Sequence, residues 1–241
     1  MNDKKIALIT GSSRGLGRAI AMKLSKENFL MIINCKKSIR EANNVKSEIK
    51  KRGYIANVII GDITKKSECK RIIKVICERY GGLDVLINNA GIYKKREKMS
   101  EEDEIELFKL KIPSIINMMD EAISAKVKSI INISSIYGII PSFSSPIVSA
   151  LQSAVINITR NYAKQFIGKI QINSIAPGWM NTTMVTTNYS EDQLRKVLNE
   201  KVPIKRLVEP EEVEENASFI IQNPLITGQT FIIDGGYHLV N

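Results

Sequence analysis

The stretch Thr10-Gly11-Ser12-Ser13-Arg14-Gly15-Leu16-Gly17 follows a short apolar run directly and leads into a segment of helical period. Glycines permit a tight turn and a close approach of the backbone to a pyrophosphate, and the free N–H groups at a helix N-terminus attract the phosphate charge. Three glycines alone are a weak signal, but a strand before them and a helix after them strengthen it. The stretch therefore predicts a dinucleotide-binding βαβ unit at the start of the chain.

Short runs rich in Ile and Val alternate with longer segments of helical period along the rest of the chain. We expect strands at residues 4–10, 29–35, 54–60, 83–87, 127–134, 169–175 and 229–233. Helices are expected at residues 16–26, 39–52, 65–80, 102–125, 146–166 and 210–222. This order predicts a single α/β domain over residues 1–241, a Rossmann fold with a seven-stranded parallel, doubly wound sheet and helices on both faces.

Two local features modify this plan. Pro113 lies inside the expected helix 102–125, where its missing N–H and its ring favour a kink. The segment 179–203 lies beyond a strand's carboxyl end, a position that covers the ligand crevice in doubly wound sheets. It is a candidate mobile lid, and an ordinary pair of surface helices is an equally good interpretation.

Composition narrows the functional classes. The 241 residues are 44% hydrophobic and carry a formal net charge of +10, which an anionic partner would explain. The lysines are scattered through helical stretches without a nucleic-acid-binding motif, so solvated helix faces explain them better and no nucleic acid is expected. The three cysteines have no metal-ligand or disulfide spacing, and no apolar run is long enough to span a bilayer. We therefore expect a cytoplasmic protein without a metal site and away from the membrane.

Further motifs follow the glycine stretch in a fixed order. They are GDI at 61–63, NNAG at 88–91, NISS at 132–135, N-x-x-x-P-G at 173–178, TG at 227–228 and DGG at 234–236. With T-G-x-x-x-G-x-G at 10–17, this set resembles the classical short-chain dehydrogenase/reductase family over nearly the whole chain. The resemblance implies cofactor contacts at Gly11, Ser13, Arg14, Gly15, Leu16, Gly17, Lys36, Asp62, Ile63, Asn89, Ala90, Gly91, Pro177, Gly178 and Thr182.

The end of the second expected strand indicates which dinucleotide is preferred. A carboxylate there would bind the ribose 2′-hydroxyl of NAD, whereas basic side chains pair with the 2′-phosphate of NADP. The chain has Asn34-Cys35-Lys36-Lys37 without a carboxylate, and Arg14 in the glycine stretch points to the same region. NADP(H) is favoured over NAD(H), although Lys36 and Lys37 are also compatible with a solvated loop edge.

The family's chemistry requires a tyrosine as general acid, a lysine four residues later, a serine and an asparagine. Ser135 matches the serine, but the tyrosine and lysine positions fall on Val148 and Gln152, and the asparagine position falls on Lys111. None of the seven tyrosines is followed by a lysine four residues later. Because valine has no proton to give and glutamine no charge, ordinary hydride transfer is expected to be absent or weak.

Three functions remain open. An active reductase resembling the 3-oxoacyl carrier-protein reductases would need a site rebuilt around Ser135, Tyr137 and Lys111, with Tyr137 reaching the crevice if the chain stays extended. A non-catalytic member would bind the dinucleotide as a sensor or as the partner of an active relative. A third reading keeps the fold for chemistry other than hydride transfer.

The resemblance also bears on partners. The substrate is an unknown small molecule or one bound to an acidic carrier protein, for which Lys126, Lys128 and Lys169 are suited if they surround the site's mouth. Relatives of this fold pair through the two long helices, here 102–125 and 146–166. A homodimer or homotetramer is expected on that ground.

Overall fold

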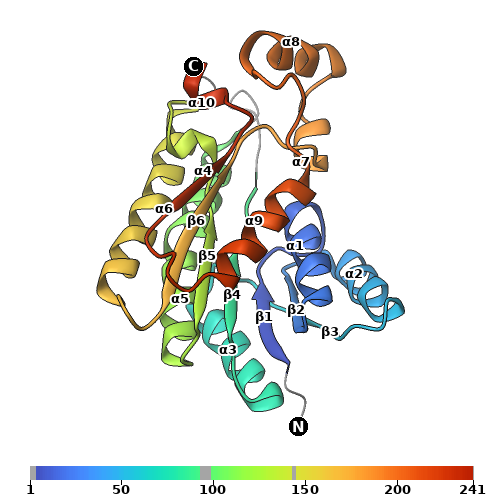
Figure 1. The fold of residues 1–241 in the computed structure, drawn as a ribbon, viewed down its shortest axis with the longest axis vertical. Helices are drawn as coiled ribbons and strands as arrows, with labels where there is room; N and C mark the ends of the chain where they lie inside the picture. Colours follow the sequence, from blue (N-terminus) through green and yellow to red (C-terminus); the bar gives the residue numbers. More distant parts are fainter. Residues whose placement is uncertain (1–3, 93–98, 143–144, 241) are drawn as a thin grey trace.

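The computed structural model describes residues 4–92, 99–142 and 145–240. Seven parallel strands form one sheet in the order β3-β2-β1-β4-β5-β6-β7, which confirms the predicted fold class (Figure 1). The strands are β1 Lys5–Ile9, β2 Phe29–Cys35, β3 Ala56–Ile60, β4 Val85–Asn88, β5 Ser129–Ile133, β6 Gln171–Pro177 and β7 Thr230–Ile233. The order reverses between β1 and β4, which makes the carboxyl ends of these two strands the topological switch point.

Helices cover both faces of the sheet (Figure 1). The first face carries α1 Gly15–Lys26, α2 Ile39–Lys51 and α9 Pro210–Gln222, and the second carries α3 Lys66–Tyr80, α5 Pro113–Ser124 and α6 Pro146–Gln165. Side chains alternate along each strand: Ala7 and Ile9 of β1 join the core of the first face, whereas Ile6 and Leu8 join that of the second. Burial on both faces explains why the strands are apolar runs.

The expected helix 102–125 is two helices, so the prediction of a single kinked helix was wrong. Helix α4 spans Glu101–Lys111, and α5 begins at Pro113, with Ile112 between them at φ −114° and ψ −78°. Proline at the first position of a helix loses no hydrogen bond, because that N–H has no partner within the helix. The break ends α4 at Lys111, above the carboxyl ends of the strands.

Short helices at the carboxyl end of the sheet complete the fold. They are η2 Ile136–Gly138, α7 Thr183–Thr186, α8 Glu191–Lys201 and α10 Tyr237–Val240. Within the expected lid 179–203, Trp179, Leu194 and Val202 pack with Ile136 and Tyr237 in a separate apolar cluster. The segment thus has an apolar anchor of its own, and its mobility remains a prediction. In the described ranges, no helix combines the length and hydropathy that a bilayer-spanning segment needs.

Glu214 is a buried carboxyl group on α9, where α9 packs against α1. Burial, followed by the negative charges of Glu211 and Glu215, raises the pKa of Glu214 to about 7. Stability is lost as pH rises from the pKa of this carboxyl group in the unfolded chain, about 4.3, to its pKa in the folded chain, so the penalty is fully present above pH 7 and nearly absent at pH 4.

We therefore expect Glu214→Gln to raise the free energy of unfolding by roughly 1–3 kcal/mol at pH 8 and to change it little at pH 4. Thermal unfolding at the two pH values measures the difference. Glu191→Gln supplies the control variant, because it makes the same change of side chain at an exposed position on α8. An equal effect of Glu214→Gln on stability at both pH values would contradict the raised pKa of Glu214.

Candidate active site

A cleft of about 500 Å³ opens at the carboxyl ends of the strands, at the switch point between β1 and β4. The loops that follow β1, β2, β4, β5 and β6 all contribute to its walls. In parallel sheets, ligands bind outside these strand ends. The topology therefore brings together motifs that are far apart in the sequence.

The glycine loop after β1 is fastened to the loop after β4. The Thr10 Oγ1 atom accepts hydrogen bonds from the backbone N–H groups of Asn89 at 3.0 Å and Ala90 at 3.1 Å. Gly11 has φ +62°, and a Cβ at this position would lie 2.8 Å from the Cα of Ala90. Only glycine permits this conformation and this approach without strain. The two loops consequently form one rigid wall of the cleft.

Asn89 and Gly17 stabilise this wall on the side that faces away from the cleft. The Asn89 Nδ2 donates to the carbonyl oxygens of Thr10 at 2.9 Å and Gly11 at 3.1 Å. A Cβ on Gly17 would lie 2.5 Å from the same nitrogen. Gly17 lies behind the loop and does not line the cleft, in contrast to the other predicted cofactor residues. Because Gly17 has no side chain, helix α1 can pack closely against the loop.

The N-terminus of α1 fits an anion. Its first turn holds no acidic residue, and Arg14 at the N-cap makes no side-chain cap. The first N–H groups of a helix need an acceptor, and the positive end of the helix dipole favours a negative one. Gly15, at φ +53°, and Ser13 keep the surface small where a pyrophosphate would lie. This part of the cleft has the donors that a dinucleotide requires.

The remaining predicted cofactor residues all contribute to the cleft wall. They are Gly11, Ser13, Arg14, Gly15, Leu16, Lys36, Asp62, Ile63, Asn89, Ala90, Gly91, Pro177, Gly178 and Thr182. Their arrangement divides the cleft into an end near β2 and β3 and an end near β5 and α6.

At the β2 end, Lys36 lies between two carboxylates. Its Nζ is 3.1 Å from Asp62 Oδ2 and 3.3 Å from Glu106 Oε1 of α4. Burial opposes the charge on Lys36, but the hydrogen bonds to Asp62 and Glu106 raise its pKa overall. For Asp62, burial is likewise outweighed, here by the hydrogen bonds from Thr64 and Lys36, which lower its pKa. Both groups therefore remain charged at neutral pH, and Lys36 is already paired.

Ser135 and Tyr137 lie in the loop after β5. This loop forms the 3₁₀ turn η2, so the chain is not extended here, the condition on which Tyr137 was predicted to reach the cleft. The backbone N–H of Tyr137 donates to the Ser135 Oγ at 3.3 Å, a bond that favours the turn. Tyr137 lines the cleft, and its ring packs edge-on against Tyr237 with 6.4 Å between ring centroids.

Val148 and Gln152 face the cleft one turn apart on α6. Val148 packs with Leu107 and Leu151 in an apolar cluster, and Ile92 and Met99 border it. The side-chain oxygen Oε1 of Gln152 is buried and has no hydrogen-bond partner among the described residues. The two positions thus present an aliphatic surface and an amide.

Lys111 enters the same end of the cleft from α4. Its side chain is 5% exposed, and Nζ donates a hydrogen bond to the carbonyl oxygen of Ile133 at 3.1 Å. A Cβ on Gly91 would lie 3.5 Å from this nitrogen. Burial lowers the pKa of Lys111 to about 8. The other described lysines with a shifted pKa, Lys23 and Lys36, have it raised, so among these three Lys111 loses its proton most readily near neutral pH.

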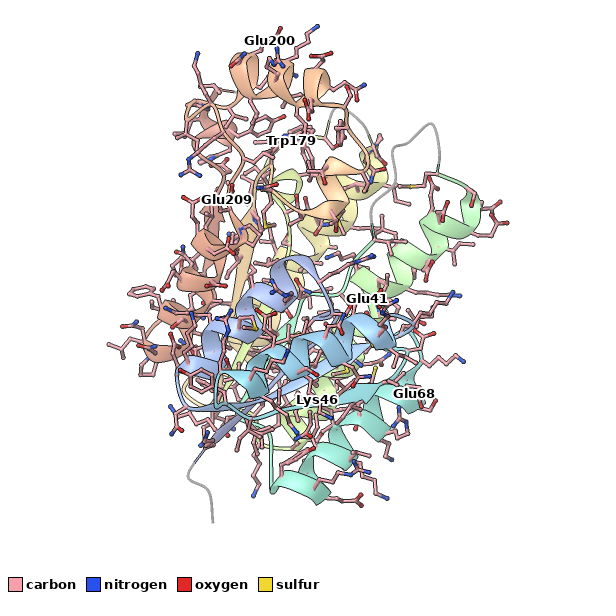
Figure 2. The ribbon with its side chains drawn as sticks, turned by 90° about the vertical axis from the view of Figure 1, so that its right-hand side faces the viewer. Glu41, Lys46, Glu68, Trp179, Glu200 and Glu209 are labelled. Carbon is pink, nitrogen blue, oxygen red and sulfur yellow. The ribbon has the colours of Figure 1, made fainter. Side chains whose placement is uncertain are left out.

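Several cleft residues were not anticipated from the sequence. They are mainly apolar or aromatic: Met99, Glu106, Leu107, Trp179, Met184 and Tyr189. Figure 2 shows Trp179 below the helix that carries Glu200, and its ring meets the Tyr189 ring edge-on at 4.9 Å. For Glu106, the only signal available was helical spacing, because it lies on the same face of α4 as Leu107, Leu110 and Lys111.

The proposed carrier-protein lysines lie elsewhere. Lys126 and Lys128 precede β5, and Lys169 precedes β6, so all three stand at the amino ends of strands, opposite the cleft. Lys128 also pairs with Asp84 at 2.8 Å. The interpretation that they surround the mouth of the site was wrong.

The parallel sheet, the glycine loop and the cleft at the switch point define a Rossmann domain of the dinucleotide-binding class. The family model described as "Enoyl-(Acyl carrier protein) reductase" matches residues 11–238, and the chain belongs to the short-chain dehydrogenase/reductase family. A 3-oxoacyl-[acyl-carrier-protein] reductase of Staphylococcus epidermidis is 31% identical over 244 residues, covering 98% of this chain and 99% of the relative.

Solved structures agree in fold. A short-chain dehydrogenase from Burkholderia cenocepacia in complex with NADP superposes with a TM-score of 0.89 at 25% identity, over 98% of this chain and 99% of that one. A variant of actinorhodin polyketide ketoreductase with NADPH gives a TM-score of 0.92 at 24% identity, over 99% of this chain and 98% of that one.

Proposed function

We propose that this chain is an NADP(H)-binding, oxidoreductase-like protein in which ordinary hydride transfer between ketones and alcohols is absent or weak. One observation carries the proposal: Val148 and Gln152, which the sequence resemblance aligns with the family's tyrosine and lysine, both line the cleft. The dinucleotide supplies hydride when bound, but the ketone oxygen must gain a proton as the hydride arrives. An aliphatic side chain cannot give one, and a neutral amide cannot lower the pKa of a neighbour.

Charge at the β2 end of the cleft supports the NADP(H) preference. Arg14, Lys36 and Lys37 line this end, and no carboxylate stands at the end of β2 itself. Arginine and lysine pair well with a phosphate, which NAD lacks at the ribose 2′ position. The ion pair of Lys36 with Glu106 opposes this preference, because the phosphate must compete with a carboxylate for the same ammonium group.

We expect Glu106→Gln to bind NADPH up to about fivefold more tightly and to change NADH affinity less, because partly exposed ion pairs contribute about 0.2–1 kcal/mol. The variant removes the competitor for Lys36 and a negative charge near the phosphate. Calorimetric titration with both nucleotides measures the ratio. Glu101, exposed on the same helix and outside the cleft, gives the control Glu101→Gln, and an equal change in both variants would refute the competition.

The proposed function is tested with the unmodified chain in two measurements. Titration with NADPH and NADH by fluorescence or calorimetry reports binding, and absorbance of NADPH with a panel of ketones reports turnover. Binding without turnover supports the proposal. Turnover above about a hundredth of the usual median kcat of roughly 10 per second would overturn it.

A second candidate is an active reductase resembling the 3-oxoacyl-[acyl-carrier-protein] reductases. It is favoured by the 31% identity with such a protein and by the presence of Ser135, Tyr137 and Lys111 in one cleft. In this function Tyr137 would give the proton and Lys111 would supply the positive charge. NADPH consumption that survives Tyr137→Phe unchanged would exclude it.

A non-catalytic sensor or partner subunit is the third candidate. Exposed apolar side chains on α4, Ile105 and Phe108, favour pairing of this face with another chain. A homodimer or homotetramer through α4 and α6 fits this surface. Sedimentation of the purified chain, alone and with NADPH, tests the assembly.

A further inference from the structure

The amine of Lys111 has an uncommon setting for a lysine. The side chain is 5% exposed and lines the cleft, and its nitrogen is held by one hydrogen bond to the backbone oxygen of Ile133. Among the described residues no carboxylate forms an ion pair with it. Buried lysines usually have a charged partner, because an isolated ammonium group is costly to bury. This site therefore favours the neutral form of the amine.

Apolar side chains enclose the same place. Leu107 lies one turn before Lys111 on α4 and packs with Val148 of α6, and Ile92 follows Gly91, where a Cβ would lie 3.5 Å from the amine. Walls of this kind leave an ammonium group poorly solvated. A desolvated lysine in a hydrophobic pocket is activated as a nucleophile towards carbonyl compounds, with which it forms Schiff bases.

We propose that Lys111 is a nucleophilic site that forms an imine with aldehydes or ketones entering the apolar end of the cleft. The nitrogen lone pair attacks the carbonyl carbon, and the π pair of the C=O bond moves to oxygen. The oxygen gains a proton and the nitrogen loses one, which gives a carbinolamine. Loss of the hydroxyl group with a second proton releases water and leaves a C=N bond, without oxidation or reduction of either partner.

This reaction needs less from the site than reduction does. Hydride transfer requires a proton donor at the position of Val148, whereas imine formation takes its protons through water and requires only a neutral amine. With a pKa of about 8, about one Lys111 amine in ten is neutral at pH 7. For a lysine with the ordinary pKa of about 10.4, the share is about one in 2,500.

The inference rests on the proposed function in one respect, that the cleft admits carbonyl compounds. The 241-residue chain without nucleotide is incubated with hexanal and cyanoborohydride, which reduces the imine to a stable secondary amine. Peptide mass spectrometry then locates the adducts. Lys37, exposed and in the same cleft, is the internal reference. At pH 7 we expect Lys111 to be modified at least about tenfold faster than Lys37, with a midpoint near pH 8.

Modification of Lys111 at the rate of Lys37 or slower would overturn the proposal. Lys111→Met should abolish the fast adduct, whereas Lys109→Met, at an exposed position on the same helix, should leave it unchanged. The wild-type measurement stands even if Lys111→Met fails to fold. A chain that binds NADPH but is not modified at Lys111 refutes this inference alone, and one that is modified but binds no nucleotide refutes the proposed function alone.

Discussion

The double variant Val148→Tyr/Gln152→Lys is expected to reduce ketones with NADPH about a hundredfold or more faster than the natural chain. A positioned general acid contributes about 10² to 10⁴ to a rate, and the two substitutions restore the donor and the charge that lowers its pKa. Both positions face the cleft from α6 one turn apart, so the new side chains would lie side by side. Absorbance of NADPH under saturating ketone measures the gain.

A control of matched size separates chemistry from shape. Val148→Phe/Gln152→Met fills similar volumes without a proton or a charge, and we expect no gain in turnover from it. Single variants should gain less than the pair, because the phenol and the ammonium act together. If the double variant binds NADPH and still fails to exceed the natural chain, other parts of the site, such as Lys111, must prevent reduction.

Gly11→Ala is expected to lower the free energy of unfolding by about 2–5 kcal/mol and NADPH affinity by at least about tenfold. The new Cβ adopts the left-handed conformation at φ +62° and would lie 2.8 Å from the Cα of Ala90. Since backbone cannot move aside as a flexible side chain does, the glycine loop and the loop after β4 must separate. Chemical denaturation and calorimetric titration measure the two losses.

Gly53 provides the control for backbone strain. It has φ +85°, but a Cβ there would meet no atom within 4 Å. Gly53→Ala should therefore cost only about 1–2 kcal/mol and leave nucleotide affinity unchanged. Equal losses in the two variants would show that the contact with Ala90 does not matter.

The order of the elements follows from local sequence patterns. Buried parallel strands need continuous apolar runs, and amphipathic helices need a hydrophobic period near 3.6. Local sequence is therefore enough to predict a strand at Ile6 to Ile9 and a helix at Ile72 to Ile76. The glycine stretch is equally local, because its backbone conformation depends on the absent side chains. The fold class and the cofactor loop were therefore predictable.

Other features depend on which distant residues meet. The sequence shows Pro113, but the surrounding packing decided that it begins a new helix and that α4 ends at Lys111. Tyr137 reaches the cleft from a 3₁₀ turn that its neighbour Ser135 supports. No periodic pattern in the sequence indicates the helix break at Pro113 or the turn at Tyr137.

The sequence by itself determined the seven-stranded plan and the glycine loop, since each depends on residue type and short spacing. The prediction that Val148 and Gln152 replace the family's tyrosine and lysine also comes from the sequence alone. Only the tertiary structure decided that Lys36 pairs with Glu106, 70 positions away, and that Lys111 is buried beside Ile133. Charge pairing and desolvation depend on distances across the fold, which no local pattern in the chain records.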